Sequence, residues 1–585
     1  MVREAVYHQM DSSYAFLIDL ETLVIRLRVK KNDIKRCILH YGDRCDICQQ
    51  PKIQSLEMKK KATDALFDYY EVEFEPGWNR IFYYFLLDDG KEQLYYFNDN
   101  FYSEANKPRT LYYQYAYFRE KDVVETPDWI RDAVMYQIFP DSFATDKAYL
   151  SSQSDQYISA NGFKSRSHLG GTLKGIQQNL DYIQELGINC IYMTPIFHSN
   201  SYHKYDIIDY YEIDPLLGTK EDFKELVEAC HHRDIRIILD GVFNHTSTDF
   251  FAFHDLLEKG EDSIYKDWYM VHHYPVEVNH PPNYEAFAYV ESMPRTNTAN
   301  EDLIDYFIKV GEYWIKEFNI DGWRLDVANE IDHDFWRAFR KAMKKLNKDI
   351  FIVGEIWEDA YSFLGGDQFD SVMNYPFMYN CEEFFAKENL SVSQFDEKMA
   401  HLRMRYKRTI QQCMMNFLDC HDVKRFMHSC QEDSNKFKMA AAFQLTYLGV
   451  PSIFYGDELG FTGLEEPEYR RKMEWSHQQE EHDILTSYKR LIKLRHSLAP
   501  LRRGDLATEF VDDDSGIYAF SRNIENHKVL VIMNGALKEQ SCQFTVHNWN
   551  RLEQVYGESA YEVTEEQLIC HLHAKDVMIF DIEES

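Results

Sequence analysis

Long apolar runs are missing from this sequence. No stretch of about 18 apolar residues occurs, which is the length that a helix needs to cross a bilayer. The first residues, MVREAVYHQMDSSYAF, have no apolar run after a basic segment, so we expect no secretory signal peptide. These absences predict a cytoplasmic protein with no membrane partner.

Basic residues are too few to balance the acidic ones. The chain has 97 acidic and 64 basic residues, which gives a formal net charge of −33. A charge of this sign opposes binding to the phosphate backbone of nucleic acids and to anionic membranes. We therefore expect no nucleic-acid partner.

Cysteines are present, but they lack the spacing of a disulfide framework. Their number is odd, at 11, and no spacing repeats, which favours a reducing cytoplasm. The one CxxC pair, Cys45 and Cys48, has no second pair near it. We interpret it as two free thiols rather than as a zinc site.

Aromatic residues, by contrast, are abundant. They make up 15% of the 585 residues, with 41 Tyr and 39 Phe. Such residues fill cores first, but they also suit ligands with flat apolar faces, such as sugar rings. The chain is too long for a single core, and its length alone suggests about three or four domains.

The chain divides into three parts by its sequence pattern. Residues 1–120 contain strands and turns, including the hairpin signal LLDDGKE, and predict an N-terminal β-sandwich. Residues 121–500 alternate eight short apolar strands with helices, which predicts an α/β fold with a closed (β/α)8 TIM barrel. An irregular insert at about 246–300 separates the third and fourth strands. Residues 501–585 predict a C-terminal β-sandwich.

Charged residues recur where the predicted barrel strands end. The catalytic groups of such barrels lie at the carboxyl ends of the strands. Arg324 and Asp326 lie two apart in the fourth strand and so point to the same face. The other strand ends give Asp240, Asn244 and His245 (third strand), Glu355 (fifth strand), and His421 and Asp422 (seventh strand). Three acids, Asp326, Glu355 and Asp422, are therefore expected at one mouth.

This group of acids favours glycoside hydrolysis. Two carboxyl groups that flank a glycosidic bond, one protonated and one ionised, carry out that reaction. Arg324 favours the ionised form of Asp326, and we expect a protein wall and nearby negative charge to raise the proton affinity of Glu355. Any one carboxylate could be a helix cap or part of an ion pair, but the coincidence of four strand ends favours a site. Trp357, on the face of Glu355, is a candidate platform for an acceptor-side sugar.

Four motifs carry a resemblance to a known family. DGVFNH, GWRLDVANE, VGEIW and NFLDCHD resemble the signature regions of the α-amylase family of glycoside hydrolases, and YQIFPDSF, HKYD and YGDELG match its lesser landmarks. The VANE segment, MPRTN at 293–297 and the N-terminal β module resemble the group of cyclomaltodextrinases, neopullulanases and maltogenic amylases. Members of that group hydrolyse α-1,4 bonds in cyclodextrins, maltooligosaccharides and pullulan.

The resemblance implies a role for each matching residue. Asp326 would be the nucleophile, Glu355 the acid that then acts as base, and Asp422 the group that holds sugar hydroxyls. Arg324 would orient Asp326, Tyr205 would stack under the reacting sugar, and Glu330 would influence whether water or a sugar is the acceptor. The predicted substrate-binding set is His203, Tyr205, Asn244, His245, Arg324, Glu330, Trp357 and His421. Without the motif, Tyr205 is more simply an ordinary half-buried tyrosine.

Three departures from the family pattern limit what the resemblance implies. The group's usual MPKLN is MPRTN here, so no role is taken from its Lys or Leu. The stretches FATDKAYL and HLGGTLKG lack carboxylates at the places where some relatives bind calcium. We therefore predict no metal site and no cofactor, with calcium as the alternative. Cys420 replaces a residue that is more often small, and we assign it no role.

These observations leave several functions open. The leading one is a retaining hydrolase of cyclodextrins, short maltooligosaccharides and pullulan, with some transglycosylation. An α-glucosidase or glucanotransferase would use the same residues. A non-catalytic carbohydrate-binding protein would have lost a carboxylate, whereas all three are present. The resemblance also implies a homodimer in which residues 1–120 narrow the partner's active-site mouth.

Overall fold

The computed structural model describes residues 1–46, 52–147, 158–160, 163–475, 483–545, 549–564 and 566–584. Cys48 lies outside these ranges, so the structure does not test the interpretation of the CxxC pair. The ten cysteines within them are all free thiols. In the same ranges, no helix combines the length and the apolar character that a membrane span requires.

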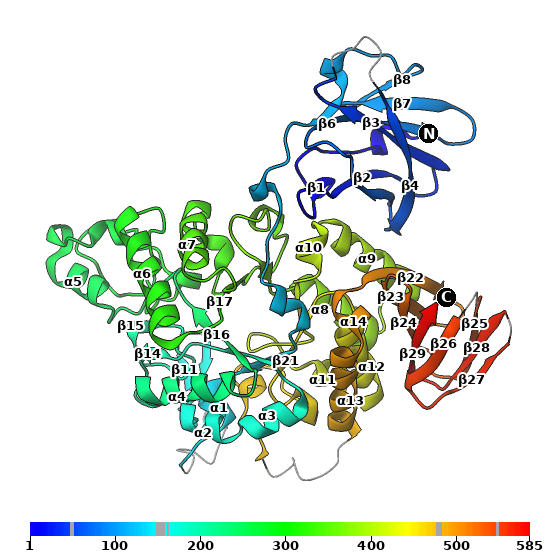
Figure 1. Ribbon diagram of the computed structural model, residues 1–585. Coiled ribbons are helices and arrows are strands. Elements are labelled where there is room, and N and C mark those ends of the chain that lie inside the picture. The colour runs from blue at the N-terminus through cyan, green and yellow to red at the C-terminus, as the bar shows by residue number, and fades with distance from the viewer. Residues whose placement is uncertain are drawn as a thin grey trace.

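The N-terminal part is a bent nine-stranded sheet (Figure 1). Strand β4 pairs with β3 along its first half and with β5 along its second half, so one sheet folds around a shared core. That core contains Leu27, Leu39, Tyr83 and Phe85. The strands are β1 (Ala15–Leu17), β2 (Leu23–Lys30), β3 (Arg36–Asp43), β4 (Gln54–Thr63), β5 (Phe67–Phe74), β6 (Ile81–Asp88), β7 (Gln93–Phe97), β8 (Asn100–Tyr102) and β9 (Tyr113–Tyr115).

The hairpin predicted from LLDDGKE is confirmed. Strands β6 and β7 pair antiparallel up to Asp88 and Gln93. Gly90 has a φ of 84°, a backbone conformation that glycine adopts without a steric cost.

The middle part is the predicted parallel barrel. Its strands run in the order β19-β18-β17-β16-β13-β10-β21-β20, and a parallel bridge between Met373 and Met415 joins the two ends of this sheet. All eight strands match apolar runs identified in the sequence. They are β10 (Met135–Ile138), β13 (Cys190–Met193), β16 (Arg236–Gly241), β17 (Gly322–Leu325), β18 (Phe351–Gly354), β19 (Ser371–Val372), β20 (Met415–Asn416) and β21 (Val450–Phe454).

Helices cover the outside of the barrel. Helix α6, for example, begins where the Asn300 side chain accepts a hydrogen bond from the Leu303 amide, and it buries Val310 and Trp314. The longer helices are α2 (Leu173–Gln178), α3 (Leu180–Leu186), α4 (Lys220–His231), α6 (Glu301–Phe318), α7 (His333–Leu346), α8 (Tyr375–Cys381), α9 (Val392–Met404), α12 (Ser434–Thr446), α13 (Asp483–Ser497) and α14 (Ala499–Arg503). Shorter ones are α1 (Pro140–Phe143), α10 (Arg408–Gln411) and α11 (Phe426–Ser429), and a π-helix follows α8 (Glu382–Ala386).

Several segments interrupt the alternation of strands and helices. The insert between β16 and α6 contains helix α5 (Phe251–Lys259) and is otherwise mostly irregular. Two hairpins precede it, β11 (Ile158–Ala160) with β12 (Phe163–Ser165), and β14 (Phe197–Ser199) with β15 (Ile207–Ile213). The second hairpin brings the loop with Tyr205 to the carboxyl end of the barrel.

The C-terminal part consists of two sheets packed on one core. The five-stranded sheet contains β22 (Asp505–Asp512), β23 (Ile517–Ile524), β24 (His527–Asn534), β29 (Asp576–Glu584) and β26 (Trp549–Tyr556). The three-stranded sheet contains β25 (Gln540–Thr545), β28 (Gln567–Leu572) and β27 (Ala560–Val563). Side chains from both sheets, among them Ile532, Leu568 and Phe580, share a buried cluster.

The N-terminal part rests on α9 and α10 of the barrel (Figure 1). Arg26 donates to the carbonyl of Met404 at 3.0 Å, and Arg408 forms an ion pair with Glu71 at 3.0 Å. These contacts join the end of α9 and the start of α10 to the nine-stranded sheet.

Acidification is expected to weaken the N-terminal part through His8. Its buried ring lies 2.7 Å from the Arg26 carbonyl and 2.9 Å from the Tyr83 hydroxyl, and burial lowers the pKa of His8 to about 4. As the pH falls, His8 is protonated in the unfolded chain at a higher pH than in the folded one. The contribution of neutral, buried His8 to the free energy of unfolding is therefore fully present above pH 6.5 and is lost as the pH falls toward 4. Between pH 7 and pH 5 the loss should be about 2 kcal/mol.

Urea unfolding of the wild type and His8→Gln at both pH values measures this effect. We expect the unfolding midpoint of the wild type to fall more than that of the variant. Equal shifts would show that His8 does not contribute.

Candidate active site

The strand ends bring the predicted acids to a single mouth of the barrel. Asp326 follows β17 directly and Glu355 follows β18 directly, and the register pairs Arg324 with Val353 across these two strands. Asp422 follows β20 after a short segment. All three acids line one cavity of about 800 Å³.

Arg324 is the centre of this group. Its guanidinium is fully buried and contacts Asp240 at 2.9 Å, Asp326 at 2.8 Å and Glu355 at 2.9 Å. Asp422 lies 4.0 Å from the same guanidinium. One cation therefore positions the two carboxyl groups that the sequence predicts to flank the glycosidic bond.

Burial strongly affects the protonation of these acids. It raises the pKa of Asp326 well above the ordinary value, and Glu355, Asp240 and Asp422 raise it further, while Arg324 opposes the shift. Burial also raises the pKa of Asp240 to about 6. Because one arginine faces four carboxyl groups, burial favours retention of a proton by the cluster in the substrate-free enzyme. The sequence indicates the effect of Arg324 on Asp326 but not the larger effect of burial.

Glu355 is held by donors on both of its oxygens. Trp357 Nε1 donates to Oε1 at 3.1 Å, and the Tyr375 hydroxyl lies 3.3 Å from the same atom. The Val327 amide donates to Oε2 at 3.0 Å. Val327 has a φ of 44°, a strained conformation for a β-branched residue, and it lies directly after Asp326. Val327 thus connects the two candidate catalytic acids, because it follows Asp326 in the chain and its amide binds Glu355.

A hydrogen-bonded group supports Asp422. Arg470 donates to Asp422 Oδ1 at 3.1 Å, and His421 Nε2 lies 3.0 Å from Oδ2. The ring of Tyr205 is parallel to that of His421, with centroids 5.5 Å apart, and its hydroxyl contacts His421 Nε2. That hydroxyl also donates to Asp240 at 3.0 Å, so Asp240 holds Tyr205 in position at the bottom of the cavity.

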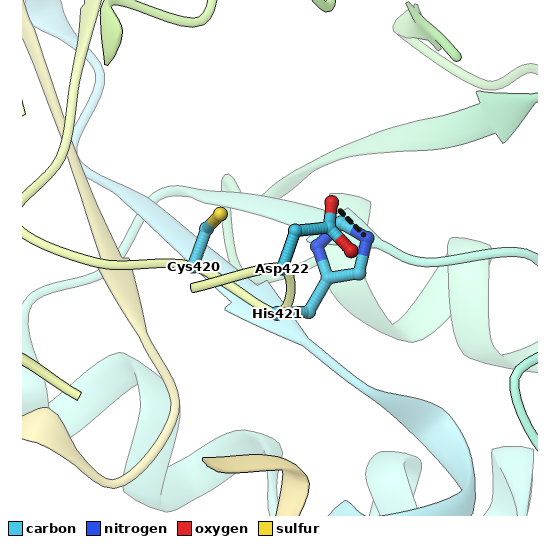
Figure 2. A group of neighbouring side chains, drawn as sticks. All are labelled: Cys420, His421 and Asp422. Atoms are coloured by element: carbon cyan, nitrogen blue, oxygen red, sulfur yellow. Dashed lines mark ion pairs between the residues drawn. The ribbon is translucent and has the colours of Figure 1, made fainter. Parts of the chain in front are cut away.

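Cys420, His421 and Asp422 form the one cluster of possible metal ligands found among the described residues. Figure 2 shows the ion pair between His421 and Asp422, with the Cys420 thiol outside it. Burial raises the pKa of the Cys420 thiol, and metals bind the thiolate form. His421 Nδ1 lies 2.5 Å from the Gln137 amide, so both ring nitrogens already contact protein groups. These contacts favour a sugar-binding role for the cluster, and the absence of a metal remains a prediction.

Among the described residues, the carboxylates near the calcium loop of some relatives are bound by other protein groups. Asp141 forms an ion pair with Arg166 at 2.6 Å and accepts backbone hydrogen bonds from Leu169 and Gly170. Asp146 accepts a hydrogen bond from Thr172 at 2.8 Å. Protein donors, one of them a cation, thus occupy the carboxylates described there.

The predicted binding residues divide into two groups. Those that line the cavity are His203, Tyr205, His245, Glu330 and Trp357. Asn244, Arg324 and His421 are buried behind its surface. Among the described residues, neither ring nitrogen of His245 has a protein hydrogen-bond partner, which suits a group that binds a ligand hydroxyl.

Several residues that line the cavity or contact its catalytic acids were not identified from the sequence. Tyr375 follows the sixth strand, and a reading of that strand end would have found it. Arg470 and Tyr469 lie in an irregular segment beyond the eighth strand, and Phe287 and Tyr289 lie in the insert. Neither segment has a periodic pattern that indicates which side chains reach the cavity. Arg295, one of the two residues of MPRTN that depart from the group's usual motif, donates to the Glu330 carbonyl at 2.7 Å.

Comparison with known proteins identifies the family. Residues 137–504 match the alpha amylase catalytic domain, and residues 1–119 match the alpha amylase N-terminal ig-like domain. The chain therefore belongs to the α-amylase family and is a glycoside hydrolase.

Individual relatives come from the group that the motifs resemble. The chain is 42% identical to a cyclomaltodextrinase of Geobacillus thermopakistaniensis, over 91% of each chain. It is also 42% identical to neopullulanase 2 of Thermoactinomyces vulgaris, over 93% of each chain. A solved structure of a cyclomaltodextrinase superposes with a TM-score of 0.93 at 35% identity and covers 99% of this chain and 100% of that one.

Proposed function

We propose that this protein is a retaining hydrolase of α-1,4-glucosidic bonds in cyclodextrins, short maltooligosaccharides and pullulan, with some transglycosylation. The observation that carries the proposal is the buried Arg324 guanidinium, which contacts both Asp326 and Glu355 at the cavity floor. A retaining mechanism needs its two carboxyl groups close together, because one of them attacks the sugar directly.

In the proposed reaction, Asp326 attacks the anomeric carbon while Glu355 donates its proton to the departing glycosidic oxygen. The bond between sugar and leaving group breaks as a bond between sugar and Asp326 forms. Glu355, now ionised, takes a proton from water, and the resulting attack on the anomeric carbon releases the sugar and restores Asp326. The product keeps the α configuration because the carbon is inverted twice.

Other side chains would hold the sugar in place. Asp422, fixed by Arg470 and His421, would accept hydrogen bonds from hydroxyls of the reacting sugar, and His245 would bind a further hydroxyl. Tyr205 would stack under that sugar, with His203 near it. Trp357, which is 41% exposed and stacked on Tyr375, would support the acceptor-side sugar. Glu330 would influence the choice between water and a sugar as acceptor.

The proposal is tested with one purified sample. We expect hydrolysis of β-cyclodextrin, maltotriose and pullulan to exceed that of soluble starch, with products that are initially α by NMR. Release of single glucose units alone would favour an α-glucosidase, and longer products without net hydrolysis would favour a glucanotransferase. Binding without turnover would favour the carbohydrate-binding alternative.

We also propose a cytoplasmic homodimer in which residues 1–120 bind the partner's barrel, residues 121–500 catalyse the reaction, and residues 501–585 complete the fold. The ten described cysteines are free, as a reducing compartment favours. Within the described residues, every side chain lining the active-site cavity comes from positions 201–470. The described residues of 1–120 do not line the cavity of their own chain, which leaves this part available to shape the cavity of a second copy.

Deleting residues 1–120 is expected to convert the dimer to a monomer and to lower the ratio of β-cyclodextrin to starch hydrolysis. The physical reason is that the partner's module would no longer exclude bulky chains from the mouth. Sedimentation velocity and the two rates measure the effect. A truncated protein that remains dimeric and keeps its rate ratio would refute this role.

A further inference from the structure

Residues 287–293 form a closed loop on the wall of the cavity, which we call the cleft ledge. The Phe287 amide donates to the Met293 carbonyl at 3.0 Å, and the Val290 amide donates to the Phe287 carbonyl at 2.8 Å. All seven of its residues line the cavity. The ledge is therefore a hydrogen-bonded turn beside the reacting carboxyl groups.

Two consecutive residues of the ledge have strained backbones. Ala288 has a φ of 47° and Tyr289 a φ of 62°, in the left-handed region that side chains disfavour. Strain of this kind persists only where the surrounding structure enforces it, and it is concentrated at ligand-binding sites. Tyr289 remains 78% exposed although it lines the cavity. The strained turn thus presents a large aromatic side chain that packs into no core.

The ledge is attached to the floor of the active site. The Thr246 amide donates to the Pro294 carbonyl at 3.1 Å, and the Thr296 amide donates to the Asn244 carbonyl at 3.0 Å. The Phe287 ring stacks on His245, with centroids 4.7 Å apart. The backbone that carries Tyr289 is therefore held in a fixed place relative to the catalytic centre, as a binding contact requires.

We propose that Tyr289 is an aromatic platform for a glucosyl residue beyond the two sugars that flank the cleaved bond. The inner part of the site already has its own stacking groups, Tyr205 and Trp357. A tyrosine on the rim offers its face to the apolar side of a further sugar ring and loses little conformational freedom on binding. The inference deepens the proposed function and rests on it, and among the short maltooligosaccharides it makes the enzyme favour maltoheptaose over maltotriose.

A ladder of substrates from maltotriose to maltoheptaose tests the proposal. Tyr289→Ala is expected to lower kcat/KM on maltoheptaose by about 3- to 10-fold, the size of one aromatic contact, and to leave maltotriose unchanged. Tyr289→Phe keeps the ring and should match the wild type. Tyr561→Ala removes a tyrosine that is 37% exposed on the C-terminal part. This control should leave kcat/KM unchanged for every substrate from maltotriose to maltoheptaose.

The outcomes separate this inference from the proposed function. A wild type that hydrolyses none of these sugars contradicts the proposed function. If the wild type is active but Tyr289→Ala has unchanged kcat/KM on every substrate, the platform is overturned and the proposed function is not. An equal loss of kcat/KM at every chain length would overturn the platform in the same way. A variant that changes only the dimer equilibrium would assign Tyr289 to the partner contact instead.

Discussion

Replacing Asp326 by asparagine is expected to lower kcat on maltotriose by about 10⁴-fold or more with little loss of fold, because the amide cannot form the glycosyl-enzyme. Glu355→Gln is expected to lower it by about 10²- to 10⁴-fold, because the leaving oxygen receives no proton. Both substitutions keep the shape of the side chain. Steady-state rates with circular dichroism as a check of folding measure the effect.

A matched substitution distinguishes catalysis from general damage. Asp334 lies in the first turn of α7 with a side chain that is 85% exposed, so Asp334→Asn should retain full activity. Wild-type rates from Asp326→Asn or Glu355→Gln would contradict the assignment of the two catalytic acids.

Arg324→Met is expected to destabilise the protein by about 3–5 kcal/mol at pH 7, because it leaves buried carboxylates without their cation. Arg324 contacts Asp240, Asp326 and Glu355, and it opposes the rise in the pKa of Asp240 and Asp326, so its removal raises the folded-state pKa of those two groups further. A carboxyl group with a raised folded-state pKa loses stability as the pH rises through that value. The loss should therefore be smaller at pH 5 than at pH 7.

A second buried arginine is a suitable control for this prediction. Arg340 pairs with Asp370, but Lys344 contacts the same carboxylate at 2.8 Å. After Arg340→Met, Lys344 still balances the charge of Asp370. We therefore expect a smaller loss of stability than in Arg324→Met, with less dependence on pH. Urea unfolding of both variants at the two pH values makes the comparison. An equal loss from Arg324→Met at pH 5 and pH 7 would disprove the charge argument.

The barrel could be predicted from the sequence because most residues on both faces of its strands are apolar, so the strands appear as short, nearly continuous apolar runs. Even β19 and β20, with two residues each, lie in such runs. The hairpin of β14 and β15 was missed because it interrupts the alternation of strand and helix. Its pairing is irregular, with register shifts on both sides of His198.

The acids of the site could also be predicted, because each follows a barrel strand and the fold brings the strand ends together. Arg470 and Tyr289 could not, since they reach the cavity from irregular segments whose course depends on long-range contacts. The large effect of burial on Asp326 was equally hidden, because the depth of a side chain depends on every element packed around it.

The most direct test of the account is to trap the glycosyl-enzyme. With Glu355→Gln and α-maltosyl fluoride, the first step needs no proton donor, whereas hydrolysis of the intermediate lacks its base. Mass spectrometry of the digested protein should find a maltosyl group on Asp326, in the peptide that covers 319–332. A maltosyl group on Asp422 instead, or rapid turnover of the fluoride with inverted product and no adduct, would contradict the proposed mechanism.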